Sequence, residues 1–232
     1  MKKMKVMTLG MCLAVLVSCG TATKNGALIG TGAGAALGAI IGKIAGNTAV
    51  GAAIGGAVGA GTGALIGKHM DKVKAQAQAV QNAQVESVTD ANGLQAVKVT
   101  FDSGILFATG SSTLSATAKS SLAKFAEVLK QNTDCDVAVQ GYTDNAGWKN
   151  STAEQSVQKN LNLSQQRAQA VTNYLNSLGV SNNQIRSTTG FGEANPVADN
   201  STAAGKAQNR RVEVYMYASQ AMIQAAEAGT LQ

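Results

Sequence analysis

Residues 136–142 read DVAVQGY, and residues 160–178 read NLNLSQQRAQAVTNYLNSL. The first stretch is short and largely apolar, which predicts a strand. The second repeats apolar residues at intervals of three and four, which predicts a helix with one apolar face, and Gly179 follows as its end. That face consists of Leu163, Ala170, Val171, Tyr174, Leu175 and Leu178. A strand followed by an amphipathic helix indicates a domain in which helices pack on a sheet.

The flanking segments extend this pattern. Residues 85–89 and 94–101 alternate between apolar and polar side chains around the turn residues 90–93, which predicts a β-hairpin. Ser115 is suited to cap a helix that runs to residue 131. Two more strands are predicted over residues 185–189 and 210–217. With the hairpin counted as one β unit, the order is β-α-β-α-β-β, which predicts an α+β sandwich with helices on one face of a mixed sheet over residues 85–217.

Two polar segments flank this domain. Residues 68–84 are rich in Gln, Ala and Lys and predict a helical connector, while residues 218–232 predict a loose helical tail.

The N-terminus has the three parts of a secretory signal peptide over residues 1–18. A lysine-rich start precedes an apolar run, residues 6–17, that is too short to span a bilayer. Ser18 and Cys19 then resemble the lipobox of bacterial lipoproteins, which implies acylation of Cys19 and a lipidated N-terminus over residues 19–25. The alternative is an ordinary signal peptide with an incidental cysteine. Gly20 replaces the aspartate that acts as an inner-membrane retention signal in some bacteria, so we expect anchoring in the outer membrane.

Glycine recurs every fourth residue in residues 26–67, a stretch that consists almost entirely of Gly, Ala, Ile, Leu and Val. The two series are Gly26, Gly30, Gly34, Gly38, Gly42 and Gly46, then Gly51, Gly55, Gly59, Gly63 and Gly67. A spacing of four keeps small residues on one face of a helix, and such faces let helices approach closely in a membrane. We therefore predict a glycine-zipper helical hairpin that turns near Asn47. The alternative is a flexible low-complexity spacer.

The formal net charge of +6 is unevenly distributed. Residues 85–217 carry eleven acidic and eleven basic residues, so that segment is formally neutral, 11 − 11 = 0. The excess lysines flank the apolar segments, where they would face a membrane surface or assist export. This placement argues against a nucleic-acid partner.

Several motifs, taken in order, resemble the OmpA-type C-terminal domain of outer-membrane proteins, peptidoglycan-associated lipoproteins and flagellar stators. The matching stretches are residues 107–114 (FATGSSTL), 141–145 (GYTDN), 160–168 (NLNLSQQRA), 190–193 (GFGE) and 209–213 (NRRVE), with Pro196. The resemblance covers about residues 95–217. The full layout, a lipobox and glycine zipper before this domain, resembles lipoproteins of the YiaD type.

The resemblance implies a domain that binds the peptide stem of peptidoglycan at its diaminopimelate residue, which carries an ammonium and a carboxylate on one carbon. Asp144 would accept the ammonium, and Arg167 would hold the carboxylate with its planar fork. Arg211 would add a cation near the other carboxylates of the stem. The residues that would shape the pocket are Thr143, Asn145, Asn160 and Leu163. The structural alternative is an ordinary ion pair between Asp144 and Arg167, with Arg210 and Arg211 as solvated strand ends.

Two features depart from the family pattern. Tyr142 stands where many relatives have histidine. Residues 148–159 form a longer link than usual between the aspartate turn and the second helix, and could fold over the pocket. Trp148 in this link is a candidate gate or stacking surface.

We find no motif for catalysis, so we expect no enzymatic activity and no cofactor. His69 is the single histidine and has no ligand partner near it in the sequence, and nothing pairs Cys135 with a histidine, so we expect no metal site. Two functions remain. In the first, the chain tethers the outer membrane to the cell wall, with its globular domain in the periplasm. In the second, the glycine zipper oligomerises into a pore or membrane scaffold.

Overall fold

The computed structural model describes residues 60–90 and 93–231. The signal peptide, Cys19 and the glycine-rich segment up to residue 59 lie outside the described residues. Among those described, no helix combines the length and the apolar character needed to cross a bilayer.

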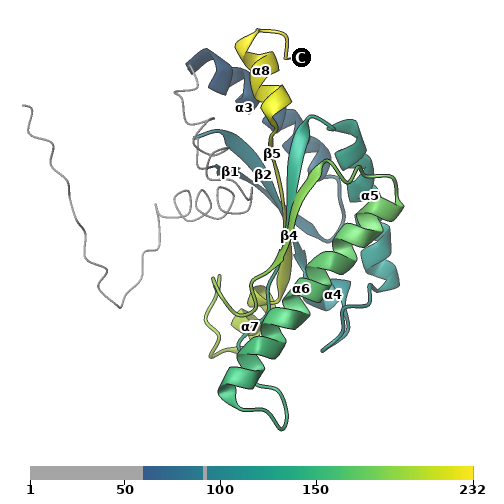
Figure 1. The fold of residues 1–232 in the computed structure, drawn as a ribbon, viewed down its shortest axis with the longest axis vertical. Helices are drawn as coiled ribbons and strands as arrows, with labels where there is room; N and C mark the ends of the chain where they lie inside the picture. The colour runs from purple at the N-terminus through teal and green to yellow at the C-terminus, as the bar shows by residue number, and fades with distance from the viewer. Residues whose placement is uncertain (1–59, 91–92, 232) are drawn as a thin grey trace, which may run out of the picture. The chain divides into compact units, whose positions relative to one another are not determined.

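A five-stranded mixed sheet forms the centre of the domain (Figure 1). Its strands are β1 (Ala83–Thr89), β2 (Gln95–Asp102), β3 (Cys135–Gly141), β4 (Ile185–Gly190) and β5 (Arg211–Ala218). They lie in the order β1-β2-β5-β3-β4. β3 and β4 are parallel and every other pair is antiparallel, with Val99 opposite both Val85 and Val214. Each predicted strand is thus confirmed, and its ends lie within two residues of the predicted ones.

Alternation along the strands separates the two faces of the sheet. On one face, Val97, Val99 and Phe101 of β2 join Val212, Val214 and Met216 of β5 in the main core. On the other face, Ala96, Ala138, Tyr215 and Tyr217 form a smaller buried cluster. The main core lies under the helices, as expected for an α+β sandwich.

On this face helix α5 (Ala116–Gln131) begins and ends where the sequence predicts, whereas helix α6 (Ala153–Ser177) begins seven residues (160 − 153) before the predicted entry at Asn160. Helix α5 starts after Ser115, whose hydroxyl accepts a hydrogen bond from the amide of Ala118. Helix α6 starts at a capping box between Thr152 and Gln155. It ends at Gly179, which adopts a φ of +91° that favours glycine. Two short helices, α4 (Ser103–Leu106) and α7 (Ala203–Asn209), were not predicted.

The connector differs from the prediction. Helix α3 runs over Ala60–Ala77 and crosses the predicted boundary between the glycine-rich hairpin and the connector. Its residues Ile66, Met70 and Val73 are fully buried and belong to the main core. Their spacing of four and three places them on one face of the helix, which packs against β2 and β1. Residues 60–77 are therefore part of the domain.

The C-terminal segment also packs more firmly than predicted. Helix α8 (Gln220–Glu227) begins at Ser219, whose hydroxyl accepts from the amide of Met222. Met222 and Ile223 are buried in the main core, and α8 lies against α3 (Figure 1). Helices α3 and α8, the first and last of the described chain, thus cover the same end of the domain.

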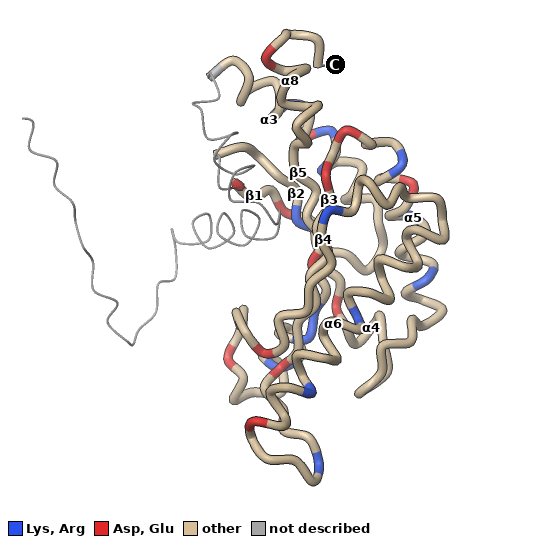
Figure 2. Tube along the Cα trace, in the orientation of Figure 1, with Lys and Arg blue, Asp and Glu red and all other residues tan. Residues whose placement is uncertain are grey.

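Charges of both signs are interspersed over the described chain (Figure 2), as the balanced composition of residues 85–217 leads one to expect.

Candidate functional site

A cavity of about 680 Å³ lies at the end of β3, opposite the end that α3 and α8 close. It is lined by α4, by the segment 107–110, by the loop 143–149 that follows β3, and by α6 and α7. Five of the predicted site residues line this cavity: Thr143, Asp144, Asn160, Leu163 and Arg167. The structure thus gathers residues that are up to 24 positions apart in the sequence (167 − 143).

Two glycines, Gly141 and Gly190, allow these residues to come together. Gly141 and Gly190 pair across the parallel strands β3 and β4, where α6 crosses them. A Cβ on Gly141 would lie 2.2 Å from the carbonyl oxygen of Ser164, and one on Gly190 would lie 2.2 Å from the amide nitrogen of Gln165. Because no larger residue fits at either position, α6 lies directly on the sheet and brings Arg167 beside the loop that carries Asp144.

Asp144 is held at the cavity wall by two contacts. Its Oδ1 accepts a hydrogen bond of 3.1 Å from the amide of Ala146, and its Oδ2 lies 2.5 Å from Nη1 of Arg210. The carboxylate is 10% exposed, whereas the side chain of Arg210 is 38% exposed. Asp144 is therefore fixed, while the tip of its partner reaches solvent.

Arg167 is oriented by main-chain carbonyl groups and not by a carboxylate. Its Nε donates to the carbonyl of Ser111 at 2.9 Å and its Nη2 to that of Ala108 at 3.4 Å, while the guanidinium lies over the ring of Phe107. Burial lowers the pKa of Arg167, as does the positive charge of Arg210, and Asp144 opposes that change. A guanidinium has five N–H donors, so about three remain for a ligand.

Two hydroxyl groups of the cavity wall are buried and have no hydrogen-bond partner among the described residues. They belong to Ser103, which is 1% exposed, and Thr143, which is 4% exposed. A buried polar group without a partner is costly, and native proteins contain few of them. The two hydroxyl oxygens are covered by neighbouring atoms, so each would have to turn toward the cavity to meet a ligand.

The charged residues of the wall are mostly cationic. Lys149, Arg167, Lys206 and Arg210 face a single acid, Asp144. Sequence analysis did not assign Arg210 or Lys206 to the site. The cavity therefore combines one fixed anion with an excess of positive charge, which suits a ligand with one ammonium and several carboxylates.

Arg211, the predicted cation for the other carboxylates of the stem, does not line the cavity. Its Nε lies 2.7 Å from Oε1 of Glu213, and its guanidinium stacks 3.8 Å from the centre of the Tyr142 ring. Arg211 and Glu213 are 5% and 3% exposed, and Tyr215 donates to the same carboxylate. Strand alternation places residues 211, 213 and 215 on one face of β5. The alternating pattern that predicted this strand therefore also indicated that Arg211 lies beside Glu213. The neighbouring residue Arg210 lines the cavity.

Asn145 also lies outside the cavity, with an exposed side chain. Asn160 lies inside and organises the loop before it. Its side-chain amide donates to the carbonyls of Asp144 and Ala146, and its Oδ1 accepts from the indole N–H of Trp148 at 2.7 Å. Trp148 belongs to the cavity wall.

Much of the long link at residues 148–159 is helical. Its residues 153–159 form the first turns of α6, which therefore extends beyond Asn160 toward the N-terminus. The main-chain amide of Trp148 donates to Ser156 in those turns, at 3.0 Å. The link therefore supports one wall of the cavity and fixes Trp148 there.

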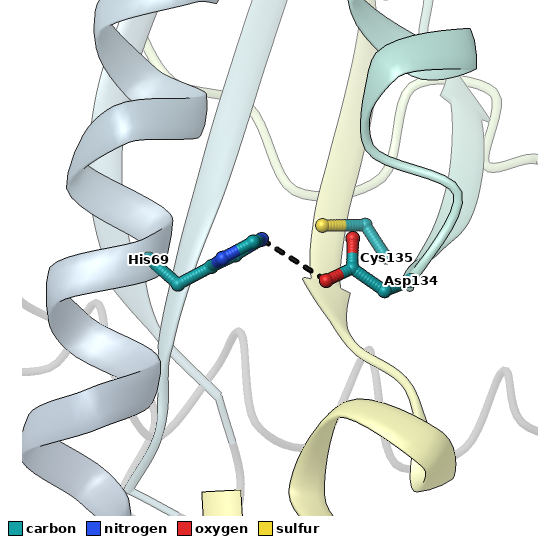
Figure 3. A group of neighbouring side chains, drawn as sticks. All are labelled: His69, Asp134 and Cys135. Carbon is teal, nitrogen blue, oxygen red and sulfur yellow. Dashed lines mark ion pairs between the residues drawn. The ribbon is translucent and has the colours of Figure 1, made fainter. Parts of the chain in front are cut away.

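A second cluster lies at the other end of β3 (Figure 3). His69 from α3 lies against Asp134 and Cys135, with Nε2 of the histidine 3.1 Å from Oδ2 of the aspartate. No sequence motif paired His69 with Cys135, but residues far apart in the sequence meet when α3 packs on the sheet.

Comparison with known proteins gives two family matches. Residues 106–210 match the OmpA family, and residues 1–71 match the YMGG-like Gly-zipper family. The probable lipoprotein YiaD of Escherichia coli is 38% identical over 149 residues, which cover 64% of this chain and 63% of that protein. The peptidoglycan-binding protein ArfA of Mycobacterium tuberculosis is 43% identical over 93 residues, 40% of this chain and 26% of that protein. The matches thus span less than two thirds of either relative.

Solved structures agree on the fold. The cell wall anchor of the T6SS from Pseudomonas aeruginosa is 28% identical, with a TM-score of 0.51 over 65% of this chain and 97% of that one. A putative MotB-like protein from Desulfovibrio vulgaris is 22% identical and gives a TM-score of 0.57 over 68% and 99% of the two chains. The second likeness concerns the fold alone.

Proposed function

Because residues 106–210 form a domain of the OmpA family, we propose that this chain binds peptidoglycan non-covalently through the cavity at the end of β3, without catalysing a reaction. One relative is named a peptidoglycan-binding protein and a structural relative is a cell wall anchor, which supports this function. The observation that carries the proposal is the meeting of Asp144, Arg167 and Arg210 around one cavity.

The proposed ligand group is the free end of diaminopimelate in the peptide stem. Its ammonium lies at Asp144, whose carboxylate keeps acceptor capacity beyond the bonds from Ala146 and Arg210. Its carboxylate lies at Arg167, which lines the cavity and keeps N–H groups beyond those bonded to Ser111 and Ala108. After turning toward the cavity, the hydroxyls of Ser103 and Thr143 supply further hydrogen bonds to the polar stem.

Arg210 changes partner in this proposal. The ligand's ammonium competes with Arg210 for Oδ2 of Asp144, and the exposed guanidinium turns toward a carboxylate elsewhere on the stem. Lys206 and Lys149 add positive charge along the same wall. The stem is polyanionic, so this excess of cations favours its approach.

The proposed attachment to the membrane is argued from the sequence alone. We propose that Cys19 is lipidated in the outer membrane and that the glycine zipper assists the anchoring, which would make the chain a tether between membrane and cell wall with its domain in the periplasm.

Co-sedimentation with insoluble peptidoglycan tests the binding. Two wall preparations form a matched pair: in one the stem carries diaminopimelate, and in the other lysine, whose free end has the ammonium but no carboxylate. We expect the full chain to pellet with the first and to pellet much less with the second. Asp144→Asn keeps the shape of the side chain but removes its charge, and we expect it to abolish pelleting.

Asp199→Asn is the control for that variant, because Asp199 is an exposed acid that does not line the cavity. It should pellet like the unmodified chain. Equal pelleting of the unmodified chain on both walls would contradict the role of Arg167, and full pelleting of Asp144→Asn would contradict the proposed site as a whole.

A further inference from the structure

We propose that His69, Asp134 and Cys135 form a binding site for a divalent cation of the zinc class, at the end of the sheet remote from the cavity. The site is independent of peptidoglycan binding, because it shares no residue with the cavity wall.

The geometry of the three side chains carries the proposal. One nitrogen, one oxygen and one sulfur atom lie within 4.8 Å of one another, and Nε2 of His69 is already 3.1 Å from Oδ2 of Asp134. Figure 3 shows His69 reaching from α3 toward the carboxylate, with the sulfur of Cys135 beside it. The ligands come from α3, from the turn before β3 and from the first residue of β3, and both α3 and β3 contribute residues to the main core.

The ligand types fit zinc. Zinc binds imidazole, carboxylate and thiolate at about 2.0–2.3 Å, so the donor atoms of a tetrahedral site lie roughly 3.3–3.8 Å apart. The widest separation must therefore close by about 1 Å. The side chains of His69 and Asp134 are 14% and 35% exposed, so small rotations of these two suffice while the buried Cys135 stays in place. The exposed side of Asp134 leaves the fourth position to water.

Binding exchanges a proton for the ion. Burial raises the pKa of Cys135, and the charges of Asp134 and Asp136 raise it further, so the thiol is protonated without the ion. The S–H bond breaks, the thiolate binds the ion and the proton leaves to solvent, so the net charge of the site rises from −1 to 0. The thiol also lies 4.0 Å from Sδ of Met70, and this weak contact is the one that the ion would replace.

Cobalt(II) is the probe, because a thiolate ligand gives it an ultraviolet charge-transfer band. The experiment uses the full chain with Cys12→Ser and Cys19→Ser and without a histidine tag, so that Cys135 is the only thiol and His69 the only histidine. We expect one equivalent of cobalt to produce the band, zinc to remove it by displacement, and zinc to raise the melting temperature by linkage.

Two variants and a control make the test specific. Cys135→Ser should lose the band. His69→Gln changes a partly exposed side chain and leaves the buried core residues in place, so it should keep the fold while losing stoichiometric cobalt binding. Asp199→Asn should behave like the parent chain. Absence of the band in the parent chain, or its persistence in Cys135→Ser, overturns the proposal, and so does unchanged binding by a folded His69→Gln.

Discussion

Gly141 and Gly190 lie opposite each other on β3 and β4, and together they form the surface on which α6 rests. This pair sets the distance between the helix that carries Arg167 and the loop that carries Asp144. We expect Gly190→Ala to destabilise the domain by about 2–4 kcal/mol, because overpacking against a backbone cannot be relieved by a side-chain rotation. Urea denaturation measures this.

Gly63→Ala is the matched control. Gly63 lies in α3, where a Cβ added to it would meet no atom within 4 Å, and alanine favours helices over glycine. We expect stability to be unchanged or to rise by up to about 1 kcal/mol. Equal stability of Gly190→Ala and the parent chain would show that α6 does not rest on these glycines.

The buried ion pair of Arg211 and Glu213 gives a second prediction. Glu213→Gln leaves the Arg211 charge buried without its counter-ion, so we expect a loss of about 3–5 kcal/mol. Replacing both residues, as in Arg211→Met with Glu213→Leu, should cost less than the two single changes added together. A double-mutant cycle in urea measures the difference.

The surface pair of Lys130 and Glu127 is the comparison, with side chains 36% and 60% exposed. Glu127→Gln should cost less than about 1 kcal/mol. If Glu213→Gln proved equally mild, the pair on β5 would be better hydrated than its burial indicates.

Trp148 reports on the loop beside the cavity, since it is the only tryptophan of the chain. Asn160→Ala removes the acceptor of its indole N–H and two bonds to the loop carbonyls. We expect a red-shifted emission and stronger quenching by acrylamide, because the ring gains contact with water. Asn173→Ala changes an exposed position of the same helix and should leave the emission as it is. Identical spectra for all three proteins would show that Asn160 does not hold the ring.

Alkaline pH should weaken the fold through the phenol of Tyr215. Burial, followed by the nearby charge of Glu213, raises the pKa of Tyr215 above its ordinary value of about 10. Below pH 10 both states keep the proton and this stabilisation is fully present. Above it the unfolded state alone releases the proton, so the free energy of unfolding falls as pH rises. We expect Tyr215→Phe to flatten this fall in urea titrations between pH 9 and about 11. An unchanged slope would assign the alkaline loss to other groups.

Local pattern was enough to predict the strands and the two long helices, because alternation, apolar spacing and caps such as Ser115 act over a few residues. The packing of α3 and α8 was not predictable in the same way. Ser219 caps α8 and the apolar residues of α3 are regularly spaced, but the burial of both helices depends on the surface that β2 and β5 supply.

For the candidate sites, too, local motifs indicated some residues, whereas other contacts depend on how distant elements pack. The family motifs placed Asp144, Arg167 and Asn160 at the cavity, where the structure has them. They also favoured Arg211 over Arg210, although the alternation of Arg211 with Glu213 indicated a buried pair. The meeting of His69 with Cys135 depends on the packing of α3 against the sheet, which no local pattern encodes.

Strand β5 separates the cavity from the helices α3 and α8 by its own length, about 25 Å for eight residues. In the proposed tether, tension would therefore enter at one end of the sheet and leave at the other, parallel to its strands. Such a load shears the hydrogen bonds of β2, β5 and β3 all at once instead of opening them one by one. A protein pulled in this direction should release its ligand before its sheet comes apart, which would let the attachment slip and form again.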